Sequence, residues 1–242
     1  MAERRVLLEG QPYYYQIHLY MPCNLRCIMC VPSGKHPKDF VSLEDFERFF
    51  DGIKHHAERI TLIGGETLLY PWINEVLDLL AQYPIGVTII TNATMLGDAL
   101  CKRLTRLHDL ELKCSIDGAT ADTFHKIRGA DVFDKVTENV QRFAHYATGK
   151  PNIKQIMCYV VMRRNFHEVF DFVDYCRPLN PYRIEFHPVR HVGAWVVDNK
   201  TGWTFDGKEQ SCESFQQEFN DVMSELDSEC EAIGLECETF RI

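Results

Sequence analysis

Residues 21–30 read Met21-Pro22-Cys23-Asn24-Leu25-Arg26-Cys27-Ile28-Met29-Cys30. This stretch contains three cysteines with the spacing C-x3-C-x2-C. Three thiolates are too few for a structural zinc ion or an ordinary [4Fe-4S] cluster, because each of these takes four ligands. Three cysteines can hold three corners of a cluster and leave its fourth iron open to a ligand. The spacing therefore points to catalysis more than to a structural metal site.

The residues between the cysteines suit a short loop around one cluster. Pro22 ends the preceding strand because it cannot donate to a strand ladder, and Asn24 tolerates turn geometry. Two other interpretations stay open: three unrelated buried cysteines, or a zinc site completed from elsewhere in the chain. His36 is the only nearby histidine, and its spacing of six from Cys30 is unusual for zinc.

Length and charge narrow the class of protein. The 242 residues are enough for one sizeable domain. A formal net charge of −9 argues against non-specific binding of nucleic acid through a basic surface. No apolar run approaches the length of a membrane span, and residues 1–10 have too short an apolar core for a signal peptide. We therefore expect a cytoplasmic protein with neither a membrane nor a nucleic-acid partner.

The ten cysteines do not predict a disulfide framework, because that inference belongs to short secreted chains. Thiols in the cytosol stay reduced, and an exposed iron–sulfur cluster needs the same environment. Four of the remaining cysteines fall within predicted helices or strands and are expected in the core, where a free cysteine behaves as a small apolar residue. These four are Cys101, Cys114, Cys158 and Cys176.

Strand and helix patterns alternate along the chain, which predicts a parallel sheet with helical crossovers. Ser42 is the expected N-cap of the first helix, and Pro71 suits the first turn of the second. Strands are expected at 14–20, 59–63, 87–92, 110–117, 153–162 and 183–187, with one more in 235–242. Helices are expected at 43–53, 71–83, 97–107, 121–126, 133–146, 166–176 and 214–232.

Polar signatures fall at the carboxyl ends of the strands, where parallel α/β barrels place their chemistry. Gly64-Gly65-Glu66 ends the second strand, and its glycines let another group approach the backbone closely. A simple turn with a surface glutamate is the alternative. Thr91 and Asn92 end the third strand and suit either a helix cap or a polar ligand contact. Ser115 and Asp117 end the fourth and, two residues apart, are expected on one side of the strand.

The cysteine loop resembles that of radical S-adenosylmethionine (SAM) enzymes. The resemblance implies that Cys23, Cys27 and Cys30 hold a [4Fe-4S] cluster whose open iron is chelated by the amino group and carboxylate of SAM. Cleavage of SAM would give a 5′-deoxyadenosyl radical that takes a hydrogen atom from a substrate. Met29 stands where the family often has an aromatic residue, and it is flexible enough to cover adenine. The family fold implied is a partial (β/α)6 barrel over residues 14–235, after an extension at 1–13.

Other segments extend the resemblance. Gly64-Gly65-Glu66 resembles the family motif that binds the SAM amine, with Thr67 in place of proline. Ser115-Ile116-Asp117-Gly118, followed by Ile127-Arg128-Gly129, resembles the branch that modifies peptides and proteins. By that resemblance Ser115 and Asp117 lie near the ribose and amino acid of SAM, and Arg128 pairs with its carboxylate. A surface ion pair of Arg128 with Asp131 or Asp134 is the alternative. The expected contacts to SAM also include Met29, Thr91, Asn92 and Met162.

Substrate contacts are expected near the sixth strand. Arg183, Glu185 and His187 alternate with apolar residues and face either the substrate or the solvent. Arg190 and His191 are further candidates for substrate contact. Tyr20 and His187 are the candidate catalytic residues. As a second hydrogen donor, Tyr20, Cys114 and Cys158 remain equally open.

The end of the chain permits two interpretations. Cys212, Cys230 and Cys237 lie where many relatives carry auxiliary clusters, but their C-x17-C-x6-C spacing lacks the tight grouping of cluster ligands. Residues 236–242 are either a last strand or the start of an absent auxiliary domain. The segment 191–211 contains Trp195 and Trp203, and it is the candidate cover of the barrel mouth.

The leading hypothesis is a radical SAM enzyme acting on a peptide or protein side chain, with a small metabolite as the alternative substrate. A reducing partner such as flavodoxin or ferredoxin would supply the electron. A non-catalytic iron–sulfur protein for electron transfer or sensing, or a zinc module, is the alternative of a different class. Metal analysis separates these hypotheses, because only the zinc module contains zinc without iron and sulfide.

Overall fold

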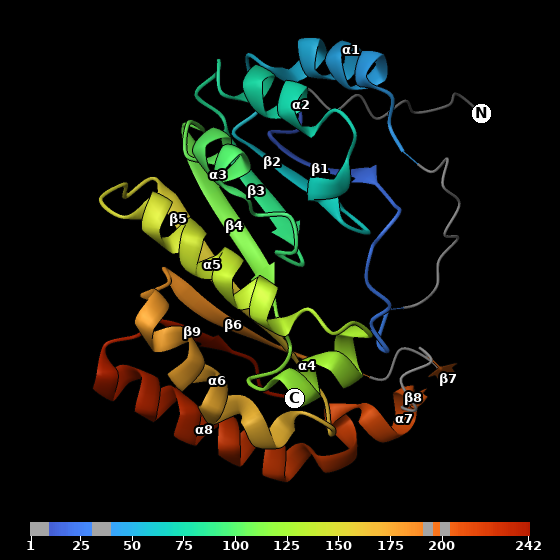
Figure 1. Cartoon of the computed structure of the whole chain (residues 1–242), viewed down its shortest axis with the longest axis vertical. Helices are drawn as coiled ribbons and strands as arrows, with labels where there is room; N and C mark the ends of the chain where they lie inside the picture. The colour runs from blue at the N-terminus through green and yellow to red at the C-terminus, as the bar shows by residue number, and fades with distance from the viewer. Residues whose placement is uncertain (1–9, 31–39, 191–195, 199–203) are drawn as a thin grey trace, which may run out of the picture.

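The computed structural model describes residues 10–30, 40–190, 196–198 and 204–242. Its centre is a seven-stranded parallel sheet in the order β1-β2-β3-β4-β5-β6-β9 (Figure 1). The strands are β1 (Tyr14–Tyr20), β2 (Arg59–Gly64), β3 (Gly86–Thr91), β4 (Asp109–Ser115), β5 (Ile153–Val161), β6 (Arg183–Pro188) and β9 (Cys237–Thr239). Within the described residues β1 and β9 are the edges and do not pair, so the expected partial barrel is confirmed.

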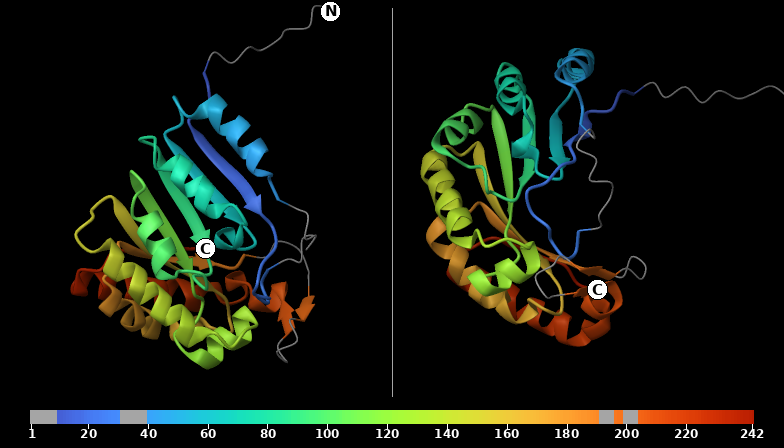
Figure 2. Two further views of the ribbon diagram at one scale, coloured as in Figure 1. Left: turned by 45° about the horizontal axis from the view of Figure 1, so that its top comes forward. Right: turned by 45° about the vertical axis from the view of Figure 1, so that its right-hand side comes forward.

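Helices cover the convex face of the curved sheet, and the cysteine loop lies on the other side (Figure 2). The α-helices are α1 (Leu43–Ile53), α2 (Ile73–Leu80), α3 (Asp98–Leu104), α4 (Ala121–Arg128), α5 (Phe133–Ala147), α6 (Val169–Cys176), α7 (Gly207–Gln210) and α8 (Gln216–Ile233). Short 3-10 helices are η1 (Thr67–Leu69), η2 (Phe166–Glu168), η3 (Arg177–Leu179) and η4 (Cys212–Phe215). None of the helices in the described residues is both long and apolar enough to span a bilayer.

Alternation along the strands separates the core from the concave face of the sheet. In β4, Leu110, Leu112 and Cys114 are fully buried in the main hydrophobic core, whereas Glu111 and Lys113 are only partly buried. Because side chains in register on neighbouring strands face the same side, the face that carries Lys113 continues through Ile156 and Cys158 of β5 to Arg183 and Glu185 of β6. The concave face therefore mixes charged and apolar side chains, in contrast to the usual apolar interior of a closed barrel.

The first helix starts as expected, whereas the second starts two residues later. Ser42 caps α1 as predicted, with its hydroxyl accepting from Asp45 N at 3.1 Å. Pro71 is not in the first turn of α2, because η1 occupies residues 67–69 and α2 begins at Ile73. The Gly64-Gly65-Glu66 turn thus leads into a tight 3-10 turn before the helix.

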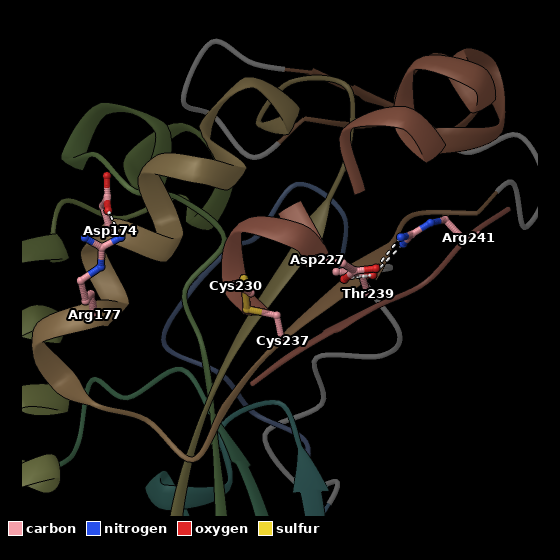
Figure 3. Close-up of a disulfide and its surroundings, with 7 residues drawn as sticks. All are labelled: Asp174, Arg177, Asp227, Cys230, Cys237, Thr239 and Arg241. Carbon is pink, nitrogen blue, oxygen red and sulfur yellow. Dashed lines mark hydrogen bonds and ion pairs between the residues drawn. A yellow bond between two sulfur atoms is a disulfide. The ribbon is translucent and has the colours of Figure 1, made fainter. Parts of the chain in front are cut away.

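The chain ends on the seventh strand. β9 pairs with β6 in parallel, which confirms the expected last strand. A disulfide joins Cys230 in α8 to Cys237 in β9, and Asp227 accepts from Thr239 Oγ1 at 2.6 Å beside it (Figure 3). This bridge contradicts the expectation that the thiols outside the cysteine loop stay reduced. Cys212 is not its partner, since its thiol donates to the carbonyl of Val161.

A small hairpin follows β6 within the segment expected to cover the barrel mouth. It consists of β7 (Val196–Asp198) and β8 (Thr204–Asp206), which are antiparallel. Phe205 of β8 is fully buried. His191, Trp195 and Trp203, together with His36, lie outside the described residues.

Candidate cofactor site

The cysteine loop is anchored on one side by the end of β2. Gly65 N donates to Tyr20 O at 2.9 Å, and Glu66 N donates to Pro22 O at 3.0 Å. A Cβ atom at Gly65 would lie 2.1 Å from Met21 O and 2.6 Å from Pro22 O. Only glycine therefore allows this backbone to approach the loop so closely. The double glycine fixes where the loop begins.

The end of α4 anchors the other side of the loop. Arg26 N donates to Arg128 O at 3.1 Å, and Ile28 N donates to Ile127 O at 2.9 Å. Gly129 ends α4 with φ +72°, and a Cβ there would lie 2.6 Å from Arg26 O. Ile127-Arg128-Gly129 thus terminates the helix and pairs with the cysteine loop.

Arg128 carries a buried positive charge next to the cysteines. Its guanidinium donates to Cys27 Sγ at 3.4 Å and pairs with Asp117 at 2.8 Å. Burial raises the pKa of the Cys27 thiol, and the Arg128 charge opposes that rise. A nearby cation favours the thiolate, which is the form that binds a metal. The alternative of a surface ion pair with Asp131 or Asp134 is wrong, because Arg128 is buried.

Glu66 organises the ends of β2 and β3. Its carboxylate accepts from Thr91 Oγ1 at 2.6 Å, Asn92 N at 2.6 Å and Leu68 N at 3.0 Å. The side chain is fully buried, so the alternative of a surface glutamate is wrong. Burial raises the pKa of Glu66, and these three hydrogen bonds oppose the rise.

Thr91 and Asn92 do not cap α3, whose N-cap is Gly97 without a side-chain hydrogen bond. Asn92 Nδ2 instead donates to Asn24 Oδ1 at 2.8 Å and contacts Cys23 Sγ at 3.8 Å. Asn24 in turn donates to Thr94 Oγ1 at 2.8 Å. The first cysteine is therefore held by a polar network from the end of β3.

Asp117 differs from its expected orientation. β4 ends at Ser115, and Asp117 has φ +65°, so the two side chains are not successive residues on one side of a strand. Asp117 Oδ1 accepts from Val160 N at 2.8 Å, and its other oxygen pairs with Arg128. Both carboxylate oxygens are thus committed to the protein. Ser115 remains half-buried at the end of β4.

Two positioning residues escaped the sequence analysis. Asn165 is fully buried and donates to Asp117 O at 3.0 Å and Val160 O at 2.9 Å. Glu168 accepts from Ala119 N at 2.9 Å and Thr123 Oγ1 at 2.6 Å, which fixes the start of α4. The only available signal was their position just after the fifth strand.

Met29 and Met162 come together in a small apolar cluster separate from the main core. Met29 packs against its buried members, which are Ile28, Ile127, Met162 and Phe205. The cluster backs the cysteine loop with residues from α4, β8 and the end of β5. Both methionines are thus at the cysteine loop, and their contact with SAM stays a prediction.

Arg183, Glu185 and His187 face the concave side of the sheet, which decides between the two expected orientations. Glu185 accepts from Lys113 Nζ at 2.8 Å and lies 3.1 Å from His187 Nε2. Tyr20 instead packs its ring against Tyr70 and Phe40. Arg190 is exposed.

The residues present fit a three-cysteine cluster and its ligand. Arg128 and Asn92 place hydrogen-bond donors next to the sulfur atoms of Cys27 and Cys23, which favours the thiolate form that binds a cluster. Thr67 Oγ1, directly after Glu66, is buried and lacks a hydrogen-bond partner within the described structure. A polar ligand beside the Gly64-Gly65-Glu66 turn would supply one.

The family model described as the Radical SAM superfamily matches residues 19–176, more than half of the chain. The chain belongs to the radical SAM superfamily. The matched segment runs from the end of β1 to the end of α6 and thus includes the cysteine loop and both of its anchors. Superfamily membership implies a [4Fe-4S] cluster and SAM as cofactors, in agreement with the sequence analysis.

Relatives in the radical SAM superfamily are longer than this chain. Mycofactocin maturase MftC of Mycobacterium tuberculosis is 28% identical over 152 residues, which cover 62% of this chain and 38% of the relative. A probable GTP 3′,8-cyclase of Saccharolobus islandicus is 30% identical over 181 residues, covering 72% and 57%. The chain therefore spans about two fifths to three fifths of these relatives.

Two solved structures share the fold of this chain. Streptococcus suis SuiB bound to precursor peptide SuiA has a TM-score of 0.73 at 19% identity, covering 95% of this chain and 49% of SuiB. The protein anSMEcpe with bound AdoMet and the Cp18Cys peptide has a TM-score of 0.70 at 16% identity, covering 93% and 62%. Both likenesses extend beyond the segment matched by the family model.

Proposed function

We propose that the chain is the SAM-cleaving part of an enzyme that removes a hydrogen atom from a peptide or protein side chain. One observation carries this proposal. The cysteine loop is fixed between the Gly64-Gly65-Glu66 turn and the end of α4, and Asn92 after β3 contacts Cys23, so that the ends of β1, β2 and β3 meet beside the three thiols. Such tight backbone anchoring suits a site that must hold a cluster and a ligand in one geometry.

The bound cofactors would supply a 5′-deoxyadenosyl radical after one-electron reduction of the cluster. The protein's part is to bind, orient and shield. In the proposal, Cys23, Cys27 and Cys30 hold the cluster. The turn at Gly64 and Gly65 receives the amino group of SAM.

The remaining site residues have supporting roles in the proposal. Glu66 keeps Thr91 and Asn92 in place through hydrogen bonds to both residues. Ser115 faces the ribose. Arg128 offers its charge to the cofactor carboxylate and to the Cys27 sulfur, and Asp117 holds the guanidinium in position. Met29 and Met162 form an apolar wall for the adenine.

A peptide substrate is favoured by the relatives. MftC is named a maturase, SuiB is described bound to a precursor peptide, and anSMEcpe is described with a peptide.

A small metabolite is the second candidate substrate, because a probable GTP 3′,8-cyclase covers a larger part of this chain than MftC does. A non-catalytic iron–sulfur protein is the alternative of another class. That alternative does not explain why the Gly64-Gly65-Glu66 turn is held so closely against the cysteine loop.

The compartment and the electron donor belong to the same proposal. An open cluster iron needs reducing surroundings, so we assign the chain to the cytoplasm with flavodoxin or ferredoxin as the donor. The Cys230–Cys237 disulfide is compatible with this assignment only as a bridge that forms and opens with the redox state.

The first experiment is anaerobic reconstitution with iron and sulfide, followed by addition of SAM and dithionite. Chromatography then measures 5′-deoxyadenosine. Cys30→Ala is the control that removes one cluster ligand. We expect 5′-deoxyadenosine from the wild type and none from the variant.

Two outcomes would contradict the proposal. A cluster that forms but neither binds nor cleaves SAM favours electron transfer or sensing. Zinc without iron or sulfide favours the structural module. Formation of 5′-deoxyadenosine that increases with a peptide pool, and not with nucleotides, would distinguish the two substrate classes.

A further inference from the structure

Cys158 is a buried thiol that does not belong to the hydrophobic core. Cys101, Cys114, Cys176 and Cys212 are all members of the main core cluster. Cys158 is 5% exposed and absent from it. Its thiol points to the concave face, where it donates to Glu185 Oε2 at 3.8 Å.

The pairing of β5 with β4 places Cys158 beside Ser115, one of the residues of the candidate cofactor site. It lies beside Ser115 of β4 on one side and Glu185 of β6 on the other. Ile116 N donates to Cys158 O at 3.0 Å, and Ile116 O accepts from Arg128 Nε at 3.3 Å. Since Arg128 also contacts Cys27 Sγ, two residues separate the backbone of Cys158 from a cluster ligand.

Cys158, Glu185 and His187 have the separations of a metal site, with ligand atoms within 4.8 Å of one another. The neighbouring charges oppose a metal ion there. Lys113 Nζ lies 2.9 and 2.8 Å from the two Glu185 oxygens, and Arg183 Nη2 lies 2.6 Å from Oε1. These cations already fill the place of a metal ion and would repel one.

Burial and the Glu185 carboxylate keep the Cys158 thiol protonated, although the charge of Lys113 acts in the opposite direction. Burial, followed by the charge of Glu185, raises the pKa of Cys158 well above its usual value. Burial alone would also raise the pKa of Glu185, but hydrogen bonds from His187, Lys113 and Arg183 lower it strongly. At neutral pH the pair is therefore an S–H group beside a carboxylate, neither a nucleophilic thiolate nor a metal ligand.

We propose that Cys158 is a catalytic hydrogen-atom donor, with Glu185 and His187 as its route for proton return. This inference rests on the proposed function, which puts a carbon-centred radical at the carboxyl ends of the strands. Among the described free thiols outside the cysteine loop, Cys158 is the one that lies outside the main core and contacts Glu185 on the concave face. Cys114 is excluded because it belongs to the hydrophobic core behind the sheet, and Tyr20 packs its partly buried ring against that same core.

The substrate radical takes the hydrogen atom of the Cys158 S–H bond, which forms a C–H bond and leaves a thiyl radical. A one-electron donor of the class that reduces the cluster then reduces the thiyl radical to a thiolate. A proton from solvent restores the thiol. His187, whose side chain is 43% exposed, connects Glu185 to solvent for this return.

The first test needs neither cluster nor SAM. Infrared difference spectra of the cluster-free protein, wild type minus Cys158→Ser, isolate the S–H stretch of Cys158. We expect a band at the low frequency of a hydrogen-bonded thiol that shifts upward in Glu185→Gln. Absence of an S–H band, or binding of one zinc ion that is lost in Cys158→Ser, would overturn the assignment.

The second test follows hydrogen transfer in the reconstituted enzyme. With SAM and dithionite in D2O and no substrate, the 5′-deoxyadenosyl radical takes deuterium from the exchanged Cys158 thiol. We expect the deuterated fraction of 5′-deoxyadenosine to fall at least about fivefold in Cys158→Ser, because a hydroxyl keeps the hydrogen bond but has a much stronger bond to hydrogen. Cys158→Ala should behave like Cys158→Ser.

Cys114→Ser is the matched control, since it changes the same atom on the neighbouring strand but on the core side, and it should retain the wild-type fraction. An unchanged deuterated fraction in both Cys158 variants would overturn the inference while leaving SAM cleavage intact. Absence of any 5′-deoxyadenosine from the wild type would instead overturn the proposed function together with this inference.

Discussion

Single residues hold the cysteine loop through backbone proximity and one buried charge pair. Gly65 has no room for a side chain because two carbonyl oxygens of the loop lie where its Cβ would be. Arg128 and Asp117 form an ion pair with side chains 8% and 0% exposed. Backbone contact fixes the position of the cysteine loop. The Arg128–Asp117 ion pair places a positive charge next to the Cys27 sulfur.

Gly65→Ala should displace the cysteine loop, because the new methyl group meets backbone atoms that cannot rotate away. We expect a loss of about 1–3 kcal/mol in the free energy of unfolding and less iron after reconstitution. Denaturant titration and iron analysis measure the two effects. Gly52→Ala in α1 is the control, because a Cβ there has open space, and its change should stay below about 1 kcal/mol. Equal iron in both variants would contradict the close-approach argument.

Asp117→Asn should destabilise the fold by about 3–5 kcal/mol, because it leaves the Arg128 guanidinium buried without its counter-charge. Asp122→Asn is the comparison, on the helix that carries Arg128. Asp122 pairs with Lys126 at the surface of α4, so its loss should cost less than about 1 kcal/mol. Urea unfolding of the cluster-free proteins measures both, and similar values for the two variants would refute the buried-pair interpretation.

At the scale of elements, parallel strands converge on one polar network. Glu185 on β6 joins Lys113 on β4, and Arg183 beside it reaches Glu238 on β9 at 3.3 Å. Carboxylate and cations thus tie three strands together across the concave face. The network replaces the apolar packing that would fill a closed barrel.

Acid should weaken this network. The hydrogen bonds that lower the pKa of Glu185 stabilise the fold above the pKa of an unfolded glutamate, about 4.3, and this contribution is lost as the pH falls towards the lower folded value. Glu185→Gln should therefore lose less stability than the wild type between about pH 5 and pH 3. Thermal unfolding across this range measures the difference. Glu47→Gln on the exposed face of α1 should keep the wild-type profile.

The short motifs of the candidate cofactor site could be predicted from the sequence. The cysteine loop, Gly64-Gly65-Glu66 and Ile127-Arg128-Gly129 carry their chemistry within a few residues, and the structure brings them together. Asn165 and Glu168 were missed because each is one polar residue whose partners come from distant segments. The turn at Asp117 was missed because only tertiary contacts favour a positive φ there.

At the scale of the whole molecule, a seven-stranded parallel sheet forms the centre, and a disulfide attaches its edge strand β9 to α8. The alternation of strands and helices predicted the parallel architecture, since local patterns repeat along the chain. The disulfide between Cys230 and Cys237 was not predicted, because six residues between two cysteines do not reveal that a helix end and a strand face each other. The position of Pro71 was also mispredicted, because a 3-10 helix at Thr67–Leu69 precedes α2 and the helix starts only at Ile73.

Cys230→Ser combined with Cys237→Ser should reduce stability by about 2 kcal/mol under oxidising conditions, because the bridge restricts the unfolded chain. With dithiothreitol present, wild type and double variant should unfold at the same denaturant concentration. Denaturant titrations with and without the reductant measure this. A difference that persists in reductant would show that packing, rather than the bridge, carries the effect.

An unclosed sheet has two edges, and they differ in length. β9 has three residues, whereas β1 has seven, and among the described residues only Phe40 and Val41 pair with its outer side near Tyr20. A long strand edge invites a strand from another molecule to add to it. Self-association of this chain at high concentration should therefore begin at residues 14–18, and Gln16→Lys, which adds a charge to that edge, should suppress it.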